Sequence, residues 1–376
     1  MKKSVYYKRE LLAELKMLVP NLAYTFTRKI KTIYIGCTDS NNLGDEAVFI
    51  ALKRMLFKRC FLYKISYTKP SSGRYFRKLF FRKPDLILLG GGTLILKNKD
   101  EGFLKLASYY NKKYPKSKLA VLGTGVANSD LAKENGFPTD FIAWKSFLKD
   151  SVFTALRGEN SIKILDYNIT PNLDTHVFYD PGIYFSKKKV TKKKGEKTIG
   201  INFCNLENRL FGHNKLEVEL FFKDLIKLLI DSNFRIHFYA TALKDYYYMK
   251  EVLDSVDLSR KDMFFHEYEP NIEKSLKFFN KVDVFIGQRL HSVVFATATY
   301  TPFFAVEYES KTSDFLNSLG LYDKSIRTDS LDAKLVFDNI ISIYNNLDIE
   351  QDLLFSKSQE AIRLQQECLD SFFSVL

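Results

Sequence analysis

An arginine and a histidine two positions apart, Arg289 and His291, are the residues of this chain best placed to do chemistry. They follow the apolar run 282–287 and open a stretch of helical character that continues to residue 299. Backbone amides at the start of a helix attract anions, a guanidinium matches phosphate or carboxylate oxygens, and histidine transfers protons near neutral pH. The pair therefore indicates an anionic substrate. The alternative is that Arg289 caps a carbonyl group and His291 packs in the core.

Two further cations follow predicted strands. Arg157 comes two residues after the strand predicted at 152–155, and Lys311 comes shortly after the strand predicted at 302–306. With Arg289, they would place three cations from both halves of the chain at one cleft, which predicts a small ligand with several negative charges. The other histidines have no comparable placement, and we expect them to be structural: His176, His213, His237 and His266.

Glycine-containing turns follow three other predicted strands, and glycine allows a ligand to approach the backbone closely. Ordinary turns between a strand and a helix use glycine for the same conformational reason. In the first turn, Asp45 can N-cap the next helix, or Asp45 and Glu46 can serve as bases for an acceptor hydroxyl. No turn fits the dinucleotide fingerprint or the phosphate loop, which disfavours nicotinamide cofactors and kinase-type ATP binding. The turns read Asn42-Leu43-Gly44-Asp45-Glu46-Ala47, Gly90-Gly91-Gly92-Thr93 and Gly123-Thr124-Gly125.

The elements that must position these residues alternate between short apolar runs and amphipathic stretches, which is typical of parallel sheets with crossover helices. Strands are predicted at 32–35, 86–89, 119–122, 152–155, 198–203, 235–239, 282–286 and 302–306. Helices are predicted at 45–57, 101–114, 140–149, 216–232, 245–256, 272–280 and 289–299, and throughout 330–376. We predict an α/β fold of two doubly wound Rossmann-like domains that face a shared cleft, with a C-terminal helical segment.

A lysine-rich stretch interrupts this alternation and predicts an interdomain linker at 186–197. The predicted organisation has a basic amphipathic segment at 1–29, an N-terminal Rossmann-like domain at 30–185 and a C-terminal one at 198–345. A helix at 346–376 is expected to pack back across both domains.

Composition limits the class of protein. Of the 376 residues, 46% are hydrophobic and 15% aromatic, so the chain can bury enough apolar surface to offset its ordering entropy. Its four cysteines are scattered, which disfavours a disulfide scaffold and structural zinc. No apolar run reaches the length of about 18 residues that would suggest a membrane span, and the first 30 residues lack an uninterrupted apolar core. We therefore predict a cytoplasmic protein.

The formal net charge of +13 is concentrated in two segments, 1–31 and 57–83. In the second, basic residues alternate with aromatic ones, and in the first they accompany leucines at helical spacing. Such segments suit peripheral contact with an anionic membrane, or they are solvated surfaces over ordinary packing. Nucleic acid is not expected as a partner, because no recognisable nucleic-acid motif is present.

The ordered set of motifs resembles the polysaccharide pyruvyl transferase family over roughly residues 31–319. The motifs are the three glycine turns, Leu156-Arg157-Gly158, Asp180-Pro181-Gly182, Arg289-Leu290-His291 and Tyr308-Glu309-Ser310-Lys311. The stretch 37–41 contains less glycine than is usual for the family, and the basic segment at 57–83 matches no family motif.

The resemblance implies a GT-B-like fold and transfer of pyruvate from phosphoenolpyruvate to two sugar hydroxyls as a cyclic ketal. It implies no metal or cofactor, and an acceptor in a bacterial cell-surface polysaccharide or its lipid-linked precursor. His291, Arg289 and Arg157 would be catalytic, and donor binding would use these three with Leu290 and Lys311. Acceptor-binding or cleft residues would be Asn42, Gly44, Asp45, Glu46, Gly91, Gly92, Thr93, Gly123 and Gly125.

In this hypothesis, His291 protonates the methylene carbon of phosphoenolpyruvate and then accepts a proton. A helix amino terminus and Arg289 favour a neutral imidazole, whereas bound phosphate would favour the charged form. Two alternatives remain. One is a GT-B glycosyltransferase whose Arg289 and Lys311 bind a nucleotide-sugar diphosphate. The other is a noncatalytic membrane- or nucleic-acid-binding protein.

Overall fold

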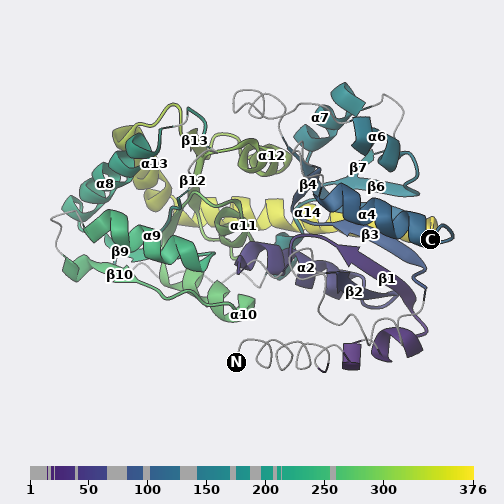
Figure 1. Cartoon of the computed structure of the whole chain (residues 1–376). Helices are drawn as coiled ribbons and strands as arrows, with labels where there is room; N and C mark the ends of the chain where they lie inside the picture. Colours follow the sequence, from purple (N-terminus) through teal and green to yellow (C-terminus); the bar gives the residue numbers. More distant parts are fainter. Residues whose placement is uncertain are drawn as a thin grey trace, which may run out of the picture.

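Two parallel β-sheets, each covered by helices, form the two halves of the molecule (Figure 1). The computed structural model describes residues 15, 18–20, 22–38, 41–65, 83–95, 102–127, 142–169, 175–186, 196–205, 210–212, 214–254 and 260–376. Parts of the predicted basic segments and most of the predicted linker, residues 187–195, therefore lie outside the described residues.

The first sheet has the strand order β2-β1-β3-β5-β6-β7, and β4 pairs with β5 beside this path. All five residues of β3 are buried, as expected for a central parallel strand that is covered on both faces. The strands are β1 (Ile30–Ile35), β2 (Cys60–Ile65), β3 (Leu86–Gly90), β4 (Thr93–Ile95), β5 (Lys118–Val126), β6 (Phe153–Leu156) and β7 (Thr175–Val177).

Among the described residues, the helices of this half include α2 (Leu43–Met55), α4 (Gly102–Lys113), α6 (Ile142–Leu148), α7 (Glu159–Ile169) and the 3-10 helix η1 (Pro181–Phe185). Strand β2 contains the first part of the basic, aromatic segment 57–83. Its Tyr63 is buried, with its ring centre 5.4 Å from that of Tyr24. This part of the segment therefore belongs to the folded sheet.

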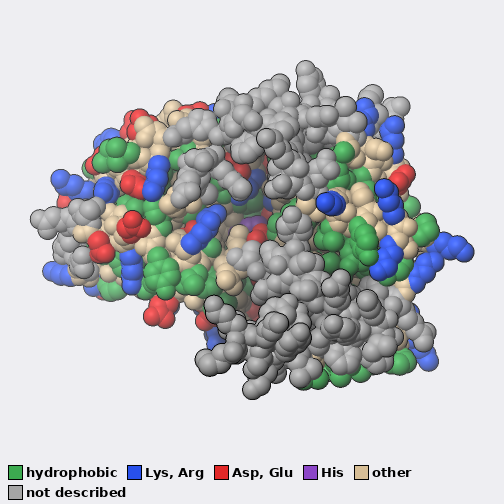
Figure 2. All heavy atoms as spheres, viewed as in Figure 1, with side chains coloured by type: hydrophobic (Ala, Val, Ile, Leu, Met, Phe, Trp, Pro, Cys, Tyr) green, Lys and Arg blue, Asp and Glu red, His purple; other side chains and the backbone are tan. Residues whose placement is uncertain are grey.

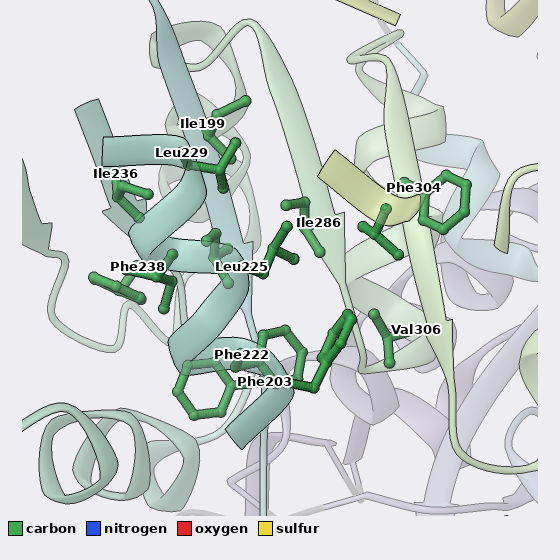
Figure 3. Packing of buried hydrophobic residues seen from close by; sticks show 14 of the residues in the cluster. Ile199, Phe203, Phe222, Leu225, Leu229, Ile236, Phe238, Ile286, Phe304 and Val306 are labelled. Carbon is green, nitrogen blue, oxygen red and sulfur yellow. The ribbon is translucent and has the colours of Figure 1, made fainter. Parts of the chain in front are cut away.

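The second sheet has the order β10-β9-β8-β11-β12-β13. Figure 3 shows helix α8 (Lys215–Asp231) against this sheet, with Phe222, Leu225 and Leu229 directed toward the strands. This apolar spacing of three and four residues is the one that predicted the helix. The strands are β8 (Thr198–Asn202), β9 (Arg235–Phe238), β10 (Met263–Phe265), β11 (Val284–Gly287), β12 (Phe303–Glu307) and β13 (Ser325–Arg327).

The remaining helices of this half are α9 (Leu243–Asp254), η2 (Arg260–Asp262), α10 (Ile272–Ser275), η3 (Leu276–Lys281), α11 (Leu290–Ala298), α12 (Ser310–Ser318) and α13 (Ala333–Asn345). The single helix predicted at 272–280 is wrong in one respect, because the stretch is a short α-helix followed by a 3-10 helix.

The long C-terminal helix α14 (Leu347–Ser374) crosses from the second half of the molecule to the first (Figure 1). Near its start, Leu354 packs in the apolar cluster that contains α11, and near its end Phe372 packs against the first sheet. Between them, the Gln365 amide donates a hydrogen bond of 2.9 Å to the Tyr179 carbonyl. The predicted α/β architecture of two Rossmann-like halves and a C-terminal helix is confirmed.

Candidate functional site

The carboxyl edges of the two sheets meet, and each edge contributes loops to the contact. On one side, the Leu43 amide donates a 2.8 Å hydrogen bond to the Thr241 carbonyl. On the other, the buried carboxylate of Asp314 accepts hydrogen bonds from the Asn160 amide at 2.9 Å and from the Ser161 hydroxyl at 2.6 Å. In sheets of this kind, ligands bind at the carboxyl ends of the strands, where the strand order reverses. Figure 2 shows a recess here that contains acidic, basic and histidine side chains.

His291 is the second residue of α11, and Arg289 in an extended conformation precedes the helix as its N-cap. The imidazole is buried against the start of α2 in the other half of the molecule. A Cβ atom added at Gly44 would lie 2.2 Å from Nδ1 of His291, well inside contact distance. Glycine at position 44 therefore makes room for the histidine ring.

The fully buried carboxylate of Asp180 connects His291 with Arg157. Its Oδ2 lies 3.6 Å from Nε2 of His291 and 3.8 Å from Nη1 of Arg157. Both distances exceed the length of a hydrogen bond. Its Oδ1 accepts a 2.8 Å hydrogen bond from the Gly182 amide, which fixes the carboxylate at the start of η1. Among the described residues, neither Oδ2 nor Nε2 has a hydrogen-bond partner.

Arg157 follows β6 and is buried beside Gly125. The turn predicted at 123–125 is wrong, because these residues lie inside β5, at an irregularity in its pairing with β6. Its Nη2 donates a 3.1 Å hydrogen bond to the Thr93 hydroxyl, while its Nε has no partner among the described residues. A Cβ atom at Gly125 would lie 2.7 Å from Nη2, so this glycine makes room for the guanidinium. The structure thus brings together Arg157, Thr93 and Gly125, which sequence analysis predicted as site residues.

Arg289 points to a different partner. Its Nε and Nη2 donate to the two oxygens of Asp245 at 3.1 and 2.7 Å, and its backbone amide donates to Asn202 at 3.0 Å. Burial opposes the charge of Arg289, but Cys204 and Asp245 outweigh burial and raise its pKa. Arg289 is therefore paired with the carboxylate of Asp245, which lies in the first turn of α9. Leu290, the next residue, is buried in the apolar cluster between α2, η1 and α11.

Lys311 lies in the first turn of α12, forms an ion pair with Glu309, and has its Nζ 4.8 Å from the Tyr308 ring centre. Burial opposes its charge, but Glu309 and Tyr308 raise its pKa. The ammonium also lowers the pKa of His291, so it lies within electrostatic reach of the imidazole.

The pKa of His291 lies below its ordinary value, chiefly because burial disfavours the charged ring. Asp180 and Asp45 raise the pKa, while Arg157 and Lys311 lower it. The imidazole of His291 was predicted to favour its neutral form, and the main cause in the structure is burial. Burial also raises the pKa of the nearby Cys37 thiol to about 12, with Asp45 acting in the same direction and Lys311 and Arg157 opposing.

The turn before α2 differs from the prediction in one respect. The N-cap is Asn42, whose side chain accepts a 3.0 Å hydrogen bond from the Gly44 amide, so the prediction that Asp45 caps the helix is wrong. Asp45 and Glu46 lie in the first turn, and Glu46 is 3.8 Å from the Lys64 ammonium.

The remaining glycines of the predicted cleft are required by the backbone. The φ angles are 71° at Gly91, 70° at Gly92 and 72° at Gly123, all in the left-handed region that favours glycine. The Gly125 amide donates a 2.8 Å hydrogen bond to the Gly92 carbonyl, which joins β5 to the turn between β3 and β4.

The other described histidines lie away from this cluster. His237 and His266 face each other at 2.9 Å between Nδ1 and Nε2, and His176 stacks on Phe153 with ring centres 4.8 Å apart. His213 is outside the described residues.

The sequence pattern places Asp180 in a motif without assigning it a role, and it does not indicate Asp245 as the partner of Arg289. The Asp-Pro-Gly motif was the available signal for Asp180. For Asp245 no local signal exists, because it lies 44 positions from Arg289.

A family model described as polysaccharide pyruvyl transferase matches residues 42–310. No curated protein matches the chain significantly in sequence.

Among solved structures, a candidate UDP-N-acetylglucosamine 2-epimerase from Listeria monocytogenes is similar with a TM-score of 0.56 and 10% identity, over 92% of this chain and 97% of that one. The UDP-GlcNAc 2-epimerase of Methanocaldococcus jannaschii gives 0.51 and 11%, over 84% and 92%. A chain of the GtfA/B complex gives 0.50 and 11%, over 80% and 59%. At such identities the similarity concerns the fold alone, and it agrees with the GT-B-like arrangement. Within the described part of the chain, no helix has the length and apolar character needed to span a membrane.

Proposed function

This chain belongs to the polysaccharide pyruvyl transferase family, and we propose that its donor substrate is phosphoenolpyruvate. In this proposal, the pyruvyl group is transferred to two hydroxyls of a sugar as a cyclic ketal, and phosphate is released. The observation that carries the proposal is the buried cluster of Arg157, Asp180 and His291 between the two sheets, with Lys311 within electrostatic reach.

The charges of the cluster suit this donor. Phosphoenolpyruvate carries a phosphate and a carboxylate, and a guanidinium can bind either group through paired donors. Arg157 has a buried Nε without a partner among the described residues, so it has donor capacity left for a ligand. Lys311 supplies a point charge. We propose that Arg289 holds the start of α11 through Asp245 and contacts the donor with its remaining nitrogen, Nη1.

The reaction requires proton transfers that His291 is positioned to make. Charged His291 gives a proton to the methylene carbon of the donor, which becomes a methyl group, and the first sugar hydroxyl forms a bond to the adjacent carbon. The bond from that carbon to the phosphate oxygen then breaks, and the second hydroxyl closes the ketal. One hydroxyl proton returns to the imidazole and the other leaves with phosphate, so atoms and charges balance. Asp45 in the first turn of α2 is our candidate base, which would take the proton of the second hydroxyl and pass it to the departing phosphate.

The acceptor in this proposal is a sugar of a bacterial cell-surface polysaccharide or of its lipid-linked precursor. A lipid-linked acceptor is supported by the basic segments, which would hold the protein at the inner face of the cell membrane. Full-length protein should bind vesicles of anionic phospholipid and lose this binding when Arg74, Arg77 and Lys78 are changed to glutamate. Unchanged binding would contradict the membrane contact.

A nucleotide-sugar glycosyltransferase is the second candidate, favoured by the GT-B-like fold. Titration calorimetry separates the two. Phosphoenolpyruvate should bind without any nucleotide, and Arg157→Ala should weaken that binding. Binding of UDP-sugars in the absence of phosphoenolpyruvate binding would favour the glycosyltransferase. Since the family is one of enzymes, nothing observed favours a noncatalytic binding protein.

A further inference from the structure

Asp180 holds an unusual position, because one unbonded carboxylate oxygen faces two groups of the site. Its Oδ2 is 3.6 Å from Nε2 of His291 and 3.8 Å from Nη1 of Arg157. The side chains of Asp180 and Arg157 are almost completely buried, and that of His291 is 11% exposed. Oδ2, Nε2 and the Nε of Arg157 lack hydrogen-bond partners among the described residues. Buried polar atoms without partners are costly, so they mark a place where a ligand or a proton completes the network.

We propose that Asp180 is a positioning residue that couples donor binding to protonation of His291. In the absence of donor, the positive charge of Arg157 balances the negative charge of Asp180. When a donor phosphate or carboxylate engages Arg157, the guanidinium charge is neutralised by the ligand. Asp180 is then left with His291 as its partner, and the imidazole takes up a proton from solvent at Nε2.

The geometry allows this change without movement of the backbone. Oδ1 remains bound to the Gly182 amide, so the carboxylate keeps its orientation while Oδ2 changes partner. A shortening of less than 1 Å would turn the 3.6 Å contact with Nε2 into a charge-assisted hydrogen bond of about 2.8 Å. Nδ1 would remain on the side of Gly44, where the first turn of α2 also holds Asp45.

The other charges around His291 agree with this coupling. Among the charged groups that act on the ring, Asp180 and Asp45 favour its charged form, whereas Arg157 and Lys311 disfavour it. An anionic donor bound by Arg157 and Lys311 would neutralise the charges of these two cations. The effect of Asp180 and Asp45 on the imidazole would then remain. The ring would thus become charged, with a proton on each nitrogen, when the carbon that needs a proton has arrived. The proton that the ring takes up comes from the solvent, and the step involves no oxidation or reduction.

The inference rests on the proposed function, and titration calorimetry of phosphoenolpyruvate binding tests both. Titrations of full-length protein at pH 7 in two buffers of different ionisation enthalpy give the number of protons taken up on binding. Wild-type protein should bind the donor with net uptake, and Asp180→Asn should bind it with that uptake largely lost. Asparagine keeps an oxygen for the Gly182 amide while removing the charge.

Two matched variants complete the design. His291→Gln shows the histidine's share, since the donor phosphate also titrates near neutral pH. Asp283→Asn alters another buried carboxylate, which accepts hydrogen bonds from the amide and hydroxyl of Thr198 in the second sheet, and should leave uptake unchanged.

Uptake by Asp180→Asn equal to that of the wild type would overturn the coupling while leaving the proposed function intact. If wild-type protein does not bind phosphoenolpyruvate, the proposed function itself is wrong. Should Asp180→Asn fail to fold, nitrogen NMR of the histidine rings in wild-type protein decides the question. A His291 ring that becomes charged on donor binding supports the coupling, and a neutral ring in both states contradicts it.

Discussion

Replacing Gly44 with alanine should damage the site through one atom. The new Cβ would lie 2.2 Å from Nδ1 and 2.3 Å from Cγ of His291. Non-bonded heavy atoms approach to about 3.5 Å, so the ring must retreat by more than about 1 Å. On its far side, Oδ2 of the buried Asp180 is 3.6 Å from Nε2, so the ring can retreat by less than about 1 Å before it meets that oxygen.

A displacement of about 1 Å at a reacting group can lower a rate about a hundredfold. We therefore expect Gly44→Ala to lower kcat by about two orders of magnitude. Overpacking should also lower the free energy of unfolding by about 1–3 kcal/mol. The assay is phosphate release at saturating phosphoenolpyruvate with an acceptor that the wild-type protein uses, alongside urea unfolding.

Gly200→Ala is the matched control. Its Cβ would lie 2.6 Å from Cδ2 of Phe285 in the core of the second sheet, so it should reduce stability similarly while kcat stays near the wild-type value. If Gly44→Ala retains kcat within about threefold while folded, the proposed packing of His291 at the start of α2 is not important for catalysis.

Three further perturbations follow from other contacts. Arg157→Lys keeps a charge but loses the guanidinium fork, so the KM for phosphoenolpyruvate should rise about tenfold to a hundredfold; an unchanged KM in steady-state kinetics would remove Arg157 from donor binding. Asp314→Ala removes the carboxylate that accepts hydrogen bonds from Asn160 and Ser161 at the start of α7. Urea unfolding should show that the free energy of unfolding falls by about 1–3 kcal/mol. An unchanged free energy of unfolding would show that the contact does not stabilise the fold. Burial and then His237 lower the pKa of His266 to about 4. This pKa is below that of histidine in the unfolded chain. The contribution of neutral His266 to the free energy of unfolding is therefore present above about pH 6.5 and is lost as pH falls toward 4. The comparison of urea unfolding at pH 7 and pH 5 should therefore show a smaller decrease for His266→Gln than for wild type, and equal decreases would contradict the assignment.

The fold was largely predictable because its central strands are continuous apolar runs. The segments 86–89 and 282–286 predicted strands that the structure has as β3 and β11, buried along their whole length. The strands that were missed are short or lie at a sheet edge. Strands β4, β7, β10 and β13 have three residues each, too few to show a pattern, and β2 is an edge strand inside a basic, aromatic stretch.

The site was predictable where a residue lies shortly after a strand. Arg157 and His291 follow β6 and β11 and do approach a common carboxylate. The partners of the cations were not predictable, because Asp180 and Asp245 reach them only through tertiary contacts. The error at Asp45 has a local cause. Asparagine and aspartate are equally good N-caps, and Asn42 stands only three residues earlier.

The most direct measurement is a joint assay of phosphate release and acceptor mass with phosphoenolpyruvate and a panel of candidate sugars. Wild-type protein should release phosphate only when an acceptor gains a pyruvyl ketal. Folded His291→Ala should lose about two to four orders of magnitude in rate, the usual contribution of a general acid or base. Ketal formation by His291→Ala at the wild-type rate, or the absence of any ketal across a panel that includes lipid-linked sugars, would contradict the proposed reaction at this site.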